Sequence, residues 1–204
     1  MSCCCFLTVF AGYHCSCAHA DLASNIDETN YSTELLTPHL SIQQAPPRQR
    51  SPPPTRSLPP PQDEDATTAT ATASASDYDQ RFGNQTAVYA QWYPNLMLNR
   101  YGPWLDLDLV IPMTATTTQI LKVWFLERDF ELPCHDYIAT SLASSERVHG
   151  EDVFLCENVQ LGLQSHGFDT GRYVPTKQIA TYHFHQQLAR DLRQYYDSNQ
   201  LPSS

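Results

Sequence analysis

The chain has 204 residues and a formal net charge of −10, a length that fits one domain of moderate size or two small ones. The acidic balance, with no dense Lys/Arg patch to meet phosphates, argues against a nucleic-acid partner. No apolar run approaches the ~20 residues that a membrane span needs, so no membrane partner is expected.

Cysteine usage favours a reducing compartment. Five of the seven cysteines lie within the first 17 residues, an odd and clustered set that is not typical of a secreted disulfide framework. The start of the chain lacks the basic region of a signal peptide and is not a Ser/Arg-rich transit peptide. We therefore expect an intracellular, cytoplasmic protein, with lipidation of Cys3 to Cys5 as an alternative fate for the N-terminus.

The composition changes twice along the chain. Residues 1–43 form an N-terminal piece, residues 44–84 a Pro/Ala/Thr-rich insertion, residues 85–198 the remaining folded part, and residues 199–204 a tail. The insertion has almost nothing apolar to bury, so the sequence predicts disorder there. Its proline runs leave open a second interpretation, docking to an SH3-like domain.

Aromatic and β-branched residues predict four strands from residue 86 onward, over 86–93, 96–101, 105–111 and 116–126. Short turns between them indicate an antiparallel meander. Helical spacing predicts three helices, over 136–148, 151–163 and from a cap at Thr176 to about residue 196. A mixed face of the third helix carries Ile179, His183, Gln186 or Gln187, and Arg190. Strands followed by helices define an α+β domain with a long C-terminal helix.

Three residues are candidates for an iron site. His14 and His19 have a His-x4-His spacing, and Asp152 lies far downstream. Two imidazoles and one carboxylate can hold one face of an Fe(II) ion and leave the other open for O2 and substrate. The spacing alone leaves other interpretations open: two loop histidines, a zinc site that adds Cys15 and Cys17, or a solvated helix cap at Asp152.

Longer segments bear a resemblance to a known family, the choline-monooxygenase branch of the Rieske non-haem iron oxygenases. The matching segments follow the family's order: Gly12 to His19 with Leu22-Ala23-Ser24, Asn95 to Trp104, Glu151 to Ser165, Gly171 to Pro175, and Tyr182 to His185. The resemblance covers residues 9–43 and 85–196 and omits the Pro/Thr-rich insertion.

The resemblance implies the helix-grip-like catalytic domain of that family, with mononuclear Fe(II) held by His14, His19 and Asp152. Glu151 is the neighbouring, less favoured carboxylate. The implied reaction is O2-dependent hydroxylation of choline towards betaine aldehyde, with a ferredoxin-type electron donor and a possible homo-oligomer. A quaternary-ammonium substrate suits an aromatic cage, for which the candidates are Trp92, Tyr93, Tyr101 and Trp104.

The sequence departs from the family at the [2Fe–2S] cluster. The family holds this cluster with Cys-x-His and Cys-x-x-His motifs, and Cys-x-x-His occurs nowhere in the chain. We therefore expect a catalytic-domain chain that does not turn over efficiently by itself. The alternatives are a non-catalytic module that binds quaternary ammonium compounds, or a degenerate paralogue that acts as an interaction protein.

Overall fold

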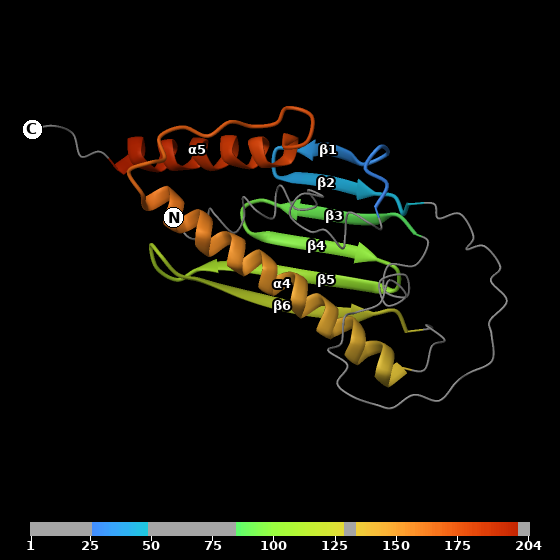
Figure 1. Ribbon diagram of the computed structural model, residues 1–204. Coiled ribbons are helices and arrows are strands. Elements are labelled where there is room, and N and C mark those ends of the chain that lie inside the picture. Colours follow the sequence, from blue (N-terminus) through green and yellow to red (C-terminus); the bar gives the residue numbers. More distant parts are fainter. Residues whose placement is uncertain (1–25, 49–84, 129–133, 200–204) are drawn as a thin grey trace, which may run out of the picture.

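The computed structural model describes residues 26–48, 85–128 and 134–199. Within them, six strands form one antiparallel sheet in the order β1-β2-β3-β4-β5-β6, and helices α4 and α5 pack on one face of it (Figure 1). The predicted α+β class is confirmed. The elements are β1 (Ser32–Thr37), β2 (Leu40–Ala45), β3 (Ala87–Trp92), β4 (Leu96–Tyr101), β5 (Trp104–Pro112), β6 (Thr118–Leu126), α4 (Cys134–Gln164) and α5 (Ile179–Asn199).

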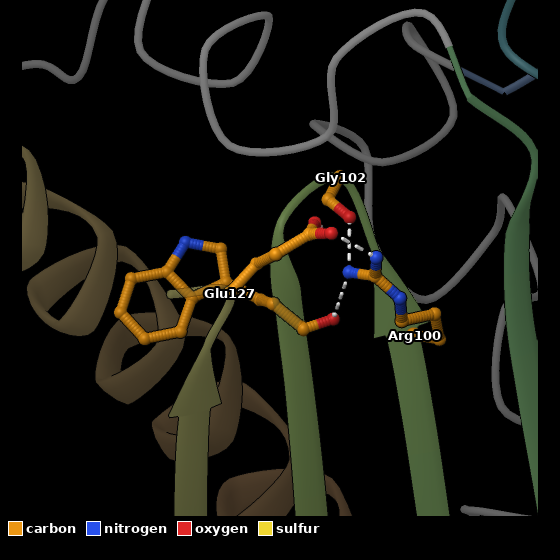
Figure 2. Close-up of polar contacts among 4 residues, drawn as sticks. Arg100, Gly102 and Glu127 are labelled. Carbon is orange, nitrogen blue, oxygen red and sulfur yellow. Dashed lines mark hydrogen bonds and ion pairs between the residues drawn. The ribbon is translucent and has the colours of Figure 1, made fainter. Parts of the chain in front are cut away.

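The meander predicted from residue 86 onward is confirmed, because each strand pairs antiparallel with its neighbour in sequence. Arg100 stabilises the turn between β4 and β5. Its guanidinium donates hydrogen bonds to the carbonyls of Gly102 and Trp104 and forms an ion pair of 3.3 Å with Glu127 (Figure 2). Gly102 has a φ of 48°, a left-handed conformation that glycine adopts without the steric cost of a Cβ.

β1 and β2 are missing from the sequence prediction. β2 pairs with β3 over residues 40–45, and Ile26 bridges to Pro47, so β2 continues two residues past the predicted boundary between residues 43 and 44. Polar side chains such as Ser41 and Gln43 are buried in β2, which hides the usual alternation of apolar and polar residues. Residues 1–25, residues 49–84 of the predicted insertion and the tail beyond Asn199 lie outside the described residues.

α4 is one helix of 31 residues where the sequence predicts two. The predicted break falls at Gly150, which is helical in the structure. A glycine inside a helix costs about 1 kcal/mol relative to alanine, and packing against the sheet offsets a penalty of that size. Among the described residues, neither helix carries an apolar stretch long enough to cross a membrane.

The face of β5 that is buried is the opposite of the one that its sequence pattern suggests. In Leu105 to Leu109 the leucines alternate with two aspartates, which is typical of a strand with its leucines buried. The structure instead buries Asp106 and Asp108, at 3% and 0% exposure, on the face that α4 covers, and leaves the leucines half-buried on the other face. The inner face of the sheet therefore carries charge.

Two apolar clusters flank this charged region. The first contains Tyr101, Trp104 and Tyr137 with neighbours from β2, β3 and β6, and the second contains Met97, Val110, Cys156 and Phe184. α4 contributes Tyr137 to one cluster and Cys156 to the other, so it spans the inner face from end to end (Figure 1). The two clusters fix the helix at both ends of the polar region between them.

Polar contacts anchor α5 to the β1–β2 and β3–β4 turns. A ring N–H of His183 donates to the Pro38 carbonyl at 3.0 Å, and the Tyr93 hydroxyl donates to Asp191 at 2.6 Å. The buried face of α5 consists of Ala180, Thr181, Phe184 and Gln187. Gln187 belongs to the predicted mixed face, whereas Ile179, His183 and Arg190 are not buried.

The segment before α5 is held by Tyr173, whose hydroxyl lies 2.6 Å from Nδ1 of His185. Burial lowers the pKa of His185 below its ordinary value of 6.5, and partial burial, then Tyr182, raises the pKa of Tyr173. At neutral pH the hydroxyl therefore donates and the neutral imidazole accepts.

This pair predicts a loss of stability on acidification. Because the folded-state pKa of His185 is depressed, the unfolded chain binds more protons as the pH falls below about 6.5, and the free energy of unfolding decreases. Urea unfolding at pH 7.5 and pH 5 should show a smaller acid-induced loss in His185→Gln than in the wild type. The control is His135→Gln, at a fully exposed side chain. Equal losses in the His185 variant and the wild type would contradict the assignment.

Candidate metal centre

A polar band crosses the inner face of the sheet. The strand register aligns Gln43, Tyr89, Asn99 and Asp106 in one cross-strand row. The adjacent row runs through Ser41, Gln91, Met97, Asp108 and Lys122. Burying polar groups costs free energy of folding unless they are hydrogen-bonded or paired. The side chains of this band therefore need partners within the core.

The centre of the band is a buried ion pair. Asp108 is fully buried, and its carboxylate lies 2.8 Å from Nζ of Lys122 and accepts a hydrogen bond of 3.1 Å from the Asn99 amide. Asp106, two residues earlier on the same face, accepts a short hydrogen bond from the Tyr101 hydroxyl. Each of the two buried aspartates of β5 thus has a dedicated donor.

α4 adds a third buried carboxylate, that of Asp152, which is 1% exposed. The buried side of the helix also includes the small residues Ser141, Ser144 and Ser145. The burial of Asp152 rules out the solvated helix cap that its position near a predicted helix start suggested. Its neighbour Glu151 is exposed.

His149 lies one helical turn before Asp152, on the same side of α4. Burial lowers the pKa of its imidazole, Lys122 lowers it further, and Asp108 and Asp152 oppose the shift. His149 is therefore close enough to all three charged groups to feel their fields, and it is neutral at pH 7. The described site thus combines a buried ion pair, a neutral imidazole and a buried carboxylate.

The other two predicted iron ligands, His14 and His19, lie outside the described residues. Within residues 26–48, 85–128 and 134–199, no group of three or more His, Cys, Asp or Glu side chains is arranged to hold a metal ion. A metal centre at Asp152 therefore has to draw ligands from elsewhere in the chain. The donor that is described fits Fe(II), because a buried carboxylate oxygen is one of the three ligands of the facial triad.

The four aromatic residues predicted as a cage do not come together. Tyr101 and Trp104 share the first apolar cluster, where the Trp104 indole donates to the Tyr137 hydroxyl at 3.0 Å. Tyr93 packs against the second cluster at the other end of β4, and Trp92 is 54% exposed. The four side chains thus occupy three environments and do not line one pocket.

Four residues of this site are not predicted by any sequence motif: Asp106, Asp108, Lys122 and His149. The sequence of β5 did contain an indication of the two aspartates, because Asp106 and Asp108 alternate with leucines and must share one face of the strand. A solvent-facing position is the ordinary interpretation of such aspartates, and only the position of α4 over the sheet shows that they point inward (Figure 1).

The fold defines the class of protein. The chain superposes on solved structures of the quaternary ammonium Rieske monooxygenase CntA, with a TM-score of 0.64 for an inhibitor complex and 0.61 for another structure, at 16% and 17% sequence identity. In both cases the match covers 93% of this chain and 46% of the other. The architecture is thus that of a Rieske oxygenase catalytic domain.

The chain belongs to the family of ring hydroxylating alpha subunits (catalytic domain), whose signature matches residues 8–194. It is 34% identical over 182 residues to the chloroplastic choline monooxygenase of Arabidopsis thaliana, and 28% identical over 185 residues to that of Spinacia oleracea. These matches cover 89% and 90% of this chain but only 37% and 36% of the relatives. The chain therefore spans little more than a third of the length of these relatives.

Proposed function

We propose that this chain is the iron-binding catalytic part of a monooxygenase that hydroxylates a quaternary ammonium compound of the choline type. The observation that carries the proposal is the buried carboxylate of Asp152 on the inner side of α4. The family membership supports the oxygenase chemistry, and the names of the plant relatives support choline as the first substrate to test.

In this proposal His14, His19 and Asp152 hold Fe(II), and iron bound there supplies O2 activation next to the substrate. The polar band beneath the helix keeps the Asp152 carboxylate in a fixed, water-poor setting. One oxygen atom enters the substrate and the other leaves as water, so the reaction consumes electrons from a donor. We propose a ferredoxin-type protein or a [2Fe–2S] domain as that donor.

The first test is metal binding. After anaerobic reconstitution, the folded chain is expected to retain about one Fe(II), the stoichiometry of a facial-triad site. His14→Ala and His19→Ala should each lose most of this iron, because each removes one of three ligands. The control is His135→Ala at a fully exposed imidazole, which should bind iron as the wild type does. A folded wild-type chain that retains no Fe(II) would refute the proposal.

The second test concerns the substrate. Choline, L-carnitine and γ-butyrobetaine are titrated against the iron-loaded chain, since carnitine and γ-butyrobetaine are the substrates bound in solved CntA complexes. Preferential binding of one of them over an uncharged isostere would identify a quaternary-ammonium site. Equal, weak binding of the charged and uncharged compounds would contradict it. The plant relatives are chloroplastic, and an intracellular location for this chain stays a proposal.

A further inference from the structure

The position of the ion pair relative to α4 follows from two contacts that bracket it. The Trp124 indole donates to Oγ of Ser145 at 3.2 Å, and further along the helix Val153 packs in the cluster that also contains Ile120. α4 therefore lies over β6 at Ser145 and crosses the sheet obliquely from there (Figure 1).

Lys122 lies midway between Ile120 and Trp124 on the same face of β6, and His149 lies midway between Ser145 and Val153. The Trp124–Ser145 contact thus puts Lys122, with its partner Asp108, near His149, which follows Ser145 by one helical turn. The electrostatic effects of Lys122, Asp108 and Asp152 on His149 agree with this placement.

The ion pair is rigidly built. The Lys122 side chain is 12% exposed, its ammonium also lies 5.9 Å from the Trp124 ring centroid, and Asn99 holds the second oxygen of Asp108. A buried pair of this kind is weak evidence for a role in stability, because apolar replacements are often as stable. Its position near the turn that carries Asp152 suggests a role at the metal site.

We propose that the Asn99–Asp108–Lys122 cluster is a platform that positions Asp152, with His149 as the side chain through which the platform acts. The inference rests on the proposed function, since it takes Asp152 as an iron ligand. Lys122 compensates the charge of Asp108. Lys122 and His149 are thus positioning residues, and neither is a ligand.

The test measures Fe(II) affinity by chelator competition and the visible spectrum of the Co(II)-substituted chain. Lys122→Met is expected to weaken Fe(II) binding about 10- to 100-fold and to change the Co(II) spectrum, and Lys122→Arg should restore most of the affinity. Lys177→Met, which breaks the exposed pair with Glu28, should leave both readouts unchanged. Arg100→Met, which loosens the β4–β5 turn, tests whether lost stability alone lowers the affinity, and it should not.

The route through His149 is tested by a double-mutant cycle. If the platform acts through His149, Lys122→Met should have little further effect in a His149→Gln background. Fully additive losses would overturn the role of His149. Wild-type affinity and spectrum in Lys122→Met would overturn the platform, while iron binding by the wild type would still support the proposed function. Failure of the wild type to bind iron would instead refute the proposed function itself.

Discussion

Asp108→Asn is expected to lower the free energy of unfolding by about 3–5 kcal/mol, the cost of leaving a buried charge without its partner. The substitution keeps the size of the side chain but removes the charge that compensates Lys122, which is 12% exposed. Urea unfolding at pH 7.5, followed by far-UV circular dichroism, measures the loss. It should be among the largest of any single polar substitution in the described residues.

An exposed ion pair provides the matched control. Glu127→Gln removes the charge that faces Arg100 on the outer side of the β4–β5 turn, where the side chains are 41% and 60% exposed (Figure 2). Surface pairs contribute about 0–1 kcal/mol, so this variant should unfold close to the wild type. Similar decreases in the free energy of unfolding of both variants would show that the buried pair contributes no more to stability than the exposed one.

Asp152→Asn is expected to reduce Fe(II) affinity by more than about 100-fold, beyond the range typical of changes to residues that only support a ligand. The amide has nearly the same shape but supplies a neutral, weaker donor. Chelator competition on the anaerobic chain measures the change, with Glu151→Gln as the adjacent, exposed control.

The result separates the two neighbouring carboxylates. Loss of iron in the Asp152 variant alone supports the assignment of Asp152. Loss in the Glu151 variant alone would transfer the role to Glu151 and would require the turn to rotate. Unchanged Fe(II) affinity in both variants would show that neither carboxylate of α4 is an iron ligand.

Much of the fold could be predicted because the signals were local. The four strands after residue 86 follow from aromatic and β-branched runs closed by Pro94 and Gly102-Pro103, and the structure confirms them. Asp152 could be singled out only through the family's motif, since its position near a predicted helix start favoured a solvated cap. The structure buries it, and whether it binds iron with His14 and His19 stays a prediction.

The rest depended on tertiary packing. Nothing local says which face of β5 a helix will cover, so the alternation of leucine and aspartate was compatible with either orientation, and α4 decides it. The break predicted near Gly150 failed for a related reason: local propensity favours a stop, and contacts at Ser145 and Val153 carry the helix through it. Tyr93 and Tyr101 lie on one segment of sequence but at opposite ends of a strand, so sequence proximity misled the cage prediction.

The unbroken course of α4 through Gly150 has a consequence for how the site moves. Gly150 meets no other atoms within 4 Å of where a Cβ would stand, and it follows His149 directly at the start of the turn that carries Asp152. Glycine has the lowest helix propensity of the residues in the middle of α4, so local opening of the helix costs least at this turn. An ion that binds only when this turn is helical would stabilise the helical form. Its affinity would then depend on the free energy of local opening in the middle of α4 and not on the free energy of unfolding of the whole domain.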